Sequence, residues 1–471
     1  MSEIKVNKLS ARTSNAITIG DTSDVVSTNT AATFKVTREE TRSITGDGST
    51  TTALAAGDIA LVDVSSATAT VQLPSSPTEG DLITVIDIAQ SAASNAITID
   101  RNGKKIENGA SNLTLGANGD MAKLLFTGDT YGWTRTSKVT GDTFVTATGG
   151  TETTSGSFKI HTFNSTSNFV VSQVSNTDAN NEVSYMVVAG GGGAGGGSCS
   201  SNWAGAGGAG GGFREGKSSI DCYSASPLNA PSGITVSAQT YPITVGAGGT
   251  SKGACTSGVA PSGASSVFST ITSAGGGGGG NRGTPGCLPG HYGANGGSGG
   301  GGAGYNLGSV PAGMPKGSGN TPPVSPPQGN DGGQGGWSAG GGGGATAAGS
   351  VGATTPTVPS SVAGGNGGAG STTSISGSPT AFAGGGGGGG AAQTGCTPAP
   401  IPSATGGTAG AGGGGAGGNG HNLPGNNGNA GTANKGGGGG GAGGGGIVRS
   451  IGANGSAGGS GIVIIRYKYQ A

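Results

Sequence analysis

The distal part of the chain contains as much glycine as collagen but lacks collagen's period. Of the 111 glycines in 471 residues, 15 precede residue 190, so 96 lie in the last 282 positions. These glycines come in blocks, such as GGGGGG at 275–280 and GGGGGGG at 384–390. A collagen triple helix needs Gly-X-Y throughout and is excluded. The remaining structures for residues 190–471 are a flexible linker, a disordered low-complexity tail and an ordered packing of extended glycine runs.

Backbone hydrogen bonding favours the ordered packing. Glycine loses more backbone entropy on ordering than any other residue, and it has no side chain to bury. A single run therefore stays a solvated coil. Many runs side by side let each N–H and C=O bond to a neighbour, and a threefold helix of the polyproline-II type directs those groups outward in three directions. We therefore predict a packed array of polyglycine-II helices.

Composition divides the chain into four stretches. Residues 1–43 are polar and Thr-rich, with one strand signal, AITIGD at 16–21. Residues 44–136 contain short apolar runs separated by turn clusters, which predicts a small β-sandwich or barrel. Residues 137–189 hold further strands that lead into the glycine-rich domain at 190–471. The heptapeptide SNAITIG at 14–20 recurs as SNAITID at 94–100, which we interpret as one turn-plus-strand unit used twice and not as a solenoid period.

Two apolar strands flank the glycine-rich region. One is EVSYMVVAG at 182–190, and the other is GIVIIRYKY at 461–469. Pairing them would bury both and join the two ends of the array. The predicted fold class is all-β: small N-terminal β modules followed by a packed array of polyglycine-II helices closed by flanking β-strands.

Charge and metal-ligand spacing exclude several functions. The formal net charge is zero, with −6 on residues 1–189 and +6 on the remainder. No cationic stripe with interleaved aromatics is present, so we expect no nucleic-acid partner. The five cysteines all lie in the glycine-rich part in no zinc spacing, and the three histidines are scattered, so we predict neither a metal site nor a cofactor. The N-terminal MSEIKVNKLS has no apolar h-region, so we expect synthesis in the cytosol without a signal peptide.

Catalytic side chains are scarce. Polysaccharide cleavage needs two neighbouring carboxylates, and the glycine-rich part offers only Glu215, Asp221 and Asp331. The carboxylates of the N-terminal part, such as Asp81 and Asp100, lie in turn sequences that they are expected to stabilise. The sequence therefore predicts a protein that is not an enzyme.

The sparse aromatic residues are the candidates for a binding surface. Trp203, Tyr292, Tyr305 and Trp337 lie at the edges of glycine runs or in the inserts between them, where Trp and Tyr can anchor a partner. Packing against the glycine runs is the alternative for each. Phe268 and Phe382 come shortly before a glycine run, and we expect them to be structural.

Five segments carry a resemblance to proteins of tailed bacteriophages. SYMVVAGGGGAGGG, SSVFSTITSAGGGGGG and the terminal GGSGIVIIRYKY resemble the glycine-rich domain of phage fibre and adhesin proteins. The opening IKVNKLSARTSNAITIGD is similar to the N-termini of phage structural proteins that attach to the virion. The stretch from NAITID to GWTRT at 95–136 resembles a small β module of phage appendages.

This resemblance implies an adhesin whose loops, on a sandwich of polyglycine-II helices, recognise a host outer-surface protein or polysaccharide. It also implies a virion location, contacts with other tail or virion proteins through the N-terminus, and a homotrimer. No binding residue is carried over, because the receptor loops vary within the family. We favour the Pro-rich insert 305–331 as a receptor loop, because proline stiffens a loop before binding. A purely structural virion fibre or spacer, a secreted glycine-rich wall protein and a depolymerase are the alternatives.

Overall fold

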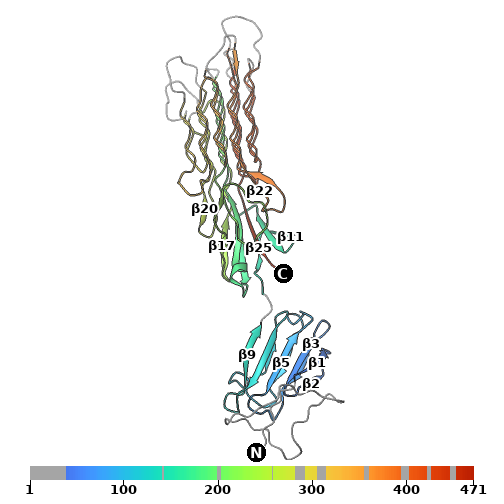
Figure 1. Ribbon diagram of the computed structural model, residues 1–471. Helices are drawn as coiled ribbons and strands as arrows, with labels where there is room; N and C mark the ends of the chain where they lie inside the picture. Colours follow the sequence, from blue (N-terminus) through green and yellow to red (C-terminus); the bar gives the residue numbers. More distant parts are fainter. Residues whose placement is uncertain are drawn as a thin grey trace, which may run out of the picture. The chain divides into compact units, whose positions relative to one another are not determined.

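The computed structural model describes residues 39–139, 143–198, 203–256, 258–281, 292–304, 314–354, 360–393, 403–421, 426–445 and 452–470. The chain divides into two compact units, Met1–Asp142 and Thr143–Ala471 (Figure 1). The described residues form strands and one 3-10 helix, η1 (Asp178–Asn181), so the all-β prediction is confirmed. The finer four-part division stays a prediction, and the strand signal at 16–21 lies outside the described residues.

The first unit consists of two sheets that share one core. One sheet has the order β1 (Glu40–Thr45), β3 (Asp58–Asp63), β5 (Leu82–Asp87), β8 (Met121–Phe126) and β9 (Trp133–Val139). The other has the order β2 (Thr51–Ala53), β4 (Ala69–Gln72), β6 (Ile97–Asp100) and β7 (Leu113–Leu115). Val62, Ile83 and Ile99 of the two sheets belong to the same buried cluster. Because none of the described sheets closes, the unit is a sandwich and not a barrel.

The first six strands of the first unit alternate between the two sheets and pair in parallel within each sheet. β1, β3 and β5 pair in parallel, and so do β2, β4 and β6. Alternating apolar residues mark which face of a strand is buried, but they carry no information about its neighbour. The short apolar runs therefore predicted the strands without their parallel pairing.

Aspartates hold the turns between these strands. Asp81 accepts a hydrogen bond from the Thr78 N–H at 2.7 Å, and Asp100 accepts one from the Asn102 N–H at 3.1 Å. The buried carboxylate of Asp87 accepts backbone N–H groups of residues 89, 91, 92 and 119. The turn-forming role expected of Asp81 and Asp100 is confirmed.

The second unit begins with two sheets that enclose an aromatic core. The first contains β11 (Thr151–Ser155), β12 (Phe158–Phe163), β25 (Ile462–Lys468), β14 (Glu182–Val188), β15 (Phe213–Gly216) and β16 (Asn229–Ala230), with β17 (Ile234–Thr235) beside β14. The second contains β10 (Thr146–Thr148), β13 (Ser167–Gln173), β18 (Thr240–Thr244), β19 (Ser266–Phe268) and β20 (Ile271–Ser273). β14 and β25 are antiparallel, with Val188 opposite Ile462, as predicted for the flanking strands.

Two small sheets complete the strands of the second unit. β21 (Ser360–Val362) pairs with β24 (Ala391–Gln393), and β22 (Ser371–Thr373) pairs with β23 (Thr380–Phe382). Phe382 of β23 is buried in a cluster with Phe213 and Ile464, so the β22–β23 hairpin packs against the larger sheet.

The glycine runs bond to one another with a period of three. In the run 190–197, every third N–H donates to the same neighbouring run. The donor–acceptor pairs are Gly191–Gly459, Ala194–Ser456 and Gly197–Ala453; Gly192–Ala209 and Gly195–Ala206; and Gly190–Ala264 and Gly193–Pro261. Three residues per turn is the repeat of a polyproline-II helix, so this run has the predicted polyglycine-II pattern.

The carbonyls of the same run accept from three further runs. The donor–acceptor pairs are Gly249–Gly191, Lys252–Ala194 and Cys255–Gly197; Gly276–Gly190 and Gly279–Gly193; and Gly439–Gly192 and Ala442–Gly195. The run therefore has six hydrogen-bonded neighbours, and the run 384–390 has six as well. This bonding on all sides confirms the packed array and excludes a flexible linker for the described runs.

The runs alternate in direction between two ends of the array (Figure 1). We call the end that carries β14 and β25 the sheet end and the opposite end the far end. Runs toward the far end are 189–197, 246–255, 274–281, 299–304, 328–336, 348–353, 383–390, 412–420 and 436–445. Runs back toward the sheet end are 204–212, 260–265, 292–297, 314–320, 339–344, 363–370, 403–411, 426–432 and 452–461. Consecutive connections therefore fall at opposite ends of the array.

Candidate binding surface at the far end

The three described aromatic candidates all lie at the far end of the array. Trp203 precedes the run 204–212, and its carbonyl accepts the Ser198 N–H at 3.1 Å. Trp337 connects the run 328–336 to the run 339–344, and its N–H donates to the Ala353 carbonyl. Tyr292 begins the run 292–297. Tyr305, the fourth candidate, lies outside the described residues.

Backbone contacts place Trp203 and Trp337 beside each other. The N–H of Gly304 donates to the carbonyl of Ala204, the residue after Trp203, at 3.1 Å. A Cβ placed on the same glycine would lie 3.0 Å from the Trp337 carbonyl oxygen. Ala204 and Ala339 belong to one buried cluster. The two tryptophans therefore flank the same small apolar contact.

The three candidates differ in how much of their side chains is accessible. Trp203 is only 6% exposed, Trp337 is half-buried, and Tyr292 is 38% exposed. Trp203 is thus mainly a packing residue, whereas Trp337 and Tyr292 are partly accessible to solvent. Phe268 and Phe382 at the sheet end are 0% and 3% exposed. The structural role expected of these two is confirmed.

The Pro-rich insert does not lie wholly at the far end. Residues 314–320 form a glycine-type run, and the prolines at 322–327 follow it at the sheet end. The N–H of Thr321 donates to the Gly296 carbonyl at 3.0 Å, and the N–H of Phe213 donates to the Gln328 carbonyl at 2.8 Å. The TPPVSPPQ part of the insert that we favoured as a receptor loop is therefore remote from Trp337, because the run 314–320 returns the chain to the sheet end. Residues 305–313 lie outside the described part.

A buried ion pair ties the last strand to the insert after β15. Arg466 Nε lies 3.0 Å from Asp221 Oδ1, and the two side chains are 3% and 0% exposed. The Ser184 hydroxyl donates to the other carboxylate oxygen at 2.9 Å, and the guanidinium lies over the ring of Phe158. Burial raises the pKa of the neighbouring Tyr223 hydroxyl, and the negative charge of Glu215 raises it further. Because these groups are enclosed, we assign them a structural role.

His161 is a second buried polar group of the sheet end. Its Nδ1 lies 2.6 Å from the Gly149 carbonyl oxygen, and its Nε2 lies 3.1 Å from the Tyr467 hydroxyl. A carbonyl oxygen accepts a hydrogen bond only from a nitrogen that carries a proton. Nδ1 therefore donates to the Gly149 carbonyl, and Nε2 accepts from the Tyr467 hydroxyl. Burial lowers the pKa of His161, which keeps the ring neutral.

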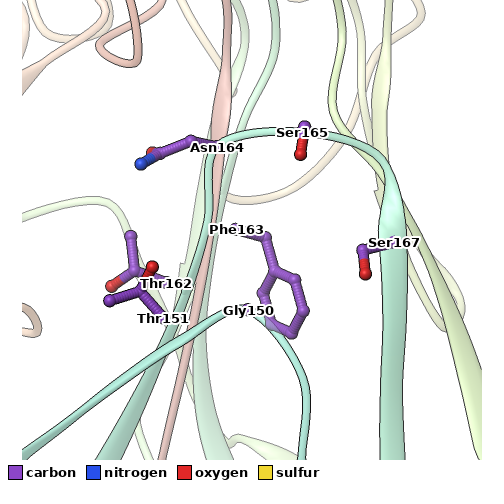
Figure 2. A pocket seen from close by; sticks show the side chains of 7 residues that line it. All are labelled: Gly150, Thr151, Thr162, Phe163, Asn164, Ser165 and Ser167. Atoms are coloured by element: carbon purple, nitrogen blue, oxygen red, sulfur yellow. The ribbon is translucent and has the colours of Figure 1, made fainter.

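A polar pocket opens where β11 begins and β12 ends. Gly150, Thr151 and Thr162 form one side, and the turn 164–167, which ends at the first residue of β13, forms the other. Figure 2 shows the ring of Phe163 between these two sides. The volume of the pocket is about 210 Å³. These residues carry no sequence signal, since Thr and Ser in TETTS and NSTS have no spacing that distinguishes a pocket from an exposed strand.

Other site types have little support in the described residues. No three His, Cys, Asp or Glu side chains among them gather in a way that could hold a metal ion. In that same part of the chain, no helix has the length and apolarity needed to span a membrane. Of the described cysteines, Cys222 is free and exposed, whereas Cys255 is disulfide-bonded.

Comparison with known proteins identifies the second unit. A search of curated proteins finds no significant match. A family model described as a glycine-rich domain matches residues 164–468, from the turn after β12 to the end of β25. This match covers well over half of the chain and includes both flanking strands and all glycine runs between them. The chain therefore belongs to the glycine-rich domain family.

Proposed function

We propose that this protein is a tail fibre or adhesin of a tailed bacteriophage and attaches the virion to a receptor on the host surface. Contact is made by the far end of the array, and the receptor is an outer-surface protein or polysaccharide. The observation that carries this proposal is the position of Trp337 and Tyr292. Both lie at the end of a frame held by backbone hydrogen bonds, and both residues are partly exposed.

The frame suits recognition for a physical reason. Each run is held by neighbours on several sides, so the ends of the runs are ordered before any partner arrives. Binding then costs less conformational entropy than it would on a flexible chain. Several copies on one particle, as in the proposed homotrimer joined to other virion proteins through the N-terminal part, would add avidity.

A purely structural fibre or spacer is the second candidate. The burial of Trp203 favours it, because that side chain is occupied by internal packing and is not available to a partner. Both candidates are binding or structural proteins without a catalytic step.

The two candidates differ in adsorption. The purified full chain should compete with virions for host cells and reduce adsorption in a dose-dependent way. A Trp337→Ala/Tyr292→Ala variant should compete at least tenfold less well, whereas Tyr131→Ala should compete like the wild type. Tyr131 is a suitable control because it is 60% exposed but belongs to the first unit.

If the Trp337→Ala/Tyr292→Ala variant competes as well as the wild type, the contact is made by another far-end connection. If the folded full chain does not compete at all, the adhesin proposal is wrong and the spacer remains.

A further inference from the structure

We propose that the pocket formed by the start of β11, the end of β12 and the turn 164–167 binds a neutral saccharide unit. The pocket lies at the sheet end, so this site is separate from the far-end surface. It is a property of the isolated protein and requires neither a virion nor a host cell.

The lining consists of hydrogen-bonding groups that the described protein leaves available. Five polar side chains surround the pocket: Thr151, Thr162, Asn164, Ser165 and Ser167. Figure 2 shows their side chains on both sides of the Phe163 ring. Four of the five are hydroxyls, each of which can donate and accept, and Asn164 adds an amide that does both. A ligand rich in hydroxyl groups matches this set, because each of its groups can find a donor or an acceptor.

The pocket lining is uncharged. Glu152 follows Thr151, but neighbouring residues of a strand point to opposite faces. Its carboxylate is 3.3 Å from Lys159 Nζ and 3.9 Å from His161 Nδ1, and neither of these partners lines the pocket. An anionic ligand such as a phosphate or a sialic acid would meet no cation among the lining residues. The chemistry therefore favours a neutral sugar.

The size of the pocket limits the ligand to one sugar ring. Its volume of about 210 Å³ is below the roughly 300–1,000 Å³ of pockets for drug-sized ligands. The bend before β11 keeps this space open, because Gly150 has a φ of 65° and carries no side chain. A Cβ there would lie 2.7 Å from the Thr162 carbonyl oxygen and 3.0 Å from the Phe163 ring.

Ligand-observed NMR and calorimetry on the full chain test this site. The probes are the methyl glycosides of glucose, galactose and mannose, and N-acetylglucosamine, with glucuronic acid and inorganic phosphate as anionic comparisons. We expect at least one neutral sugar to bind with a Kd of about 1 mM and the anions to bind at least tenfold more weakly.

The decisive variant is Thr151→Val/Thr162→Val, which keeps the shape and strand preference of both side chains and removes both hydroxyls. It should weaken sugar binding about tenfold or more, since two hydrogen bonds are lost. The matched control is Thr153→Val/Thr154→Val, which changes exposed residues of the same strand outside the pocket. If the first variant unfolds, Ser165→Ala/Ser167→Ala on the exposed turn makes the same test.

Three results would overturn the proposal. They are no binding of any neutral probe at 20 mM (about twenty times the expected Kd), equal binding to the pocket and control variants, and preferential binding of the anions. None of them bears on adsorption through the far end, so the two proposals fail separately.

Discussion

A single methyl group in the middle of a glycine run tests the packed array most directly. Gly387 lies in the run 384–390, and a Cβ added to it would lie 2.1 Å from the Gly407 carbonyl oxygen and 2.6 Å from the carbonyl carbon. Real Cβ atoms do not approach heavy atoms closer than about 3.0 Å. Both contacting atoms belong to backbone, so no side chain can rotate away. Gly387→Ala must therefore displace a run.

The cost follows from the bonds that such a displacement stretches. The N–H of Gly387 donates to the Gly415 carbonyl at 2.9 Å, and its carbonyl accepts from the Gly441 N–H at 2.9 Å. Overpacking costs about 1–3 kcal/mol, and each weakened buried hydrogen bond adds about 1 kcal/mol. We expect the free energy of unfolding of the second unit to fall by about 3–5 kcal/mol, a large share of the roughly 5–15 kcal/mol typical of a domain.

Gly253→Ala is the matched control within the same array. A Cβ at Gly253 would lie 3.7 Å from Asn454 Oδ1 and 3.9 Å from Thr256 Cγ2, which are ordinary contacts. Replacing glycine by alanine at such a site reduces the entropy of the unfolded chain and stabilises by up to about 1 kcal/mol. Urea unfolding of the full-length variants should therefore give opposite shifts in midpoint. Equal midpoints for the two variants would refute close packing around Gly387.

Two further predictions concern the buried polar groups of the sheet end. Burial lowers the pKa of His161 below its ordinary 6.5, so the unfolded state takes up the proton first and stability should fall as the pH drops below 6.5. In thermal unfolding between pH 7 and 5.5, His161→Gln should remove this part of the pH dependence of stability. A pH dependence that is the same in the variant and the wild type would show that the ring is not buried in its neutral form. Arg466→Met leaves the Asp221 carboxylate buried without its cation and should lower the free energy of unfolding by about 3–5 kcal/mol. Adding Asp221→Asn to the same chain should restore part of this loss. If the losses of the two single variants simply add in the double variant, the two side chains do not interact directly.

Much of this fold was predictable because the sequence patterns have strong local causes. The apolar runs EVSYMVVAG and GIVIIRYKY form β14 and β25, and they pair because each needs an apolar neighbour and they flank the glycine-rich region in the sequence. The packing of the runs was predictable from backbone hydrogen bonding alone, because a glycine block has no side chains that could make other interactions. The turn carboxylates Asp81 and Asp100 also followed, because aspartate caps nearby N–H groups.

Other features depend on contacts that no local pattern encodes. The parallel pairing of β3 with β5 requires knowledge of which sheet each strand joins, and alternation specifies only its buried face. Trp203 is 6% exposed, and the Gly304 N–H that donates to its neighbour Ala204 comes from a distant part of the sequence. The polar pocket arises only when Gly150, Thr162 and the turn 164–167 come together in space. The position of the prolines at 322–327 depends on the direction of one run, 314–320, which its sequence does not mark.

The two ends of the array constrain their sequences differently, and this bears on how receptor specificity would change. Connections at the sheet end contribute Phe213, Tyr223 and Ile243 to buried cores, so substitutions there alter stability. Between the ends, the runs are held by backbone hydrogen bonds, and at most of their glycines an added Cβ would meet neighbouring backbone. At the far end, Tyr292 is exposed and Trp337 half-buried, so their side chains can change at little cost to the frame. If the protein is an adhesin, substitutions that change the host range should therefore fall in the far-end connections and leave the unfolding midpoint unchanged. Host-range substitutions that fall in the sheet-end connections instead would favour the structural alternative.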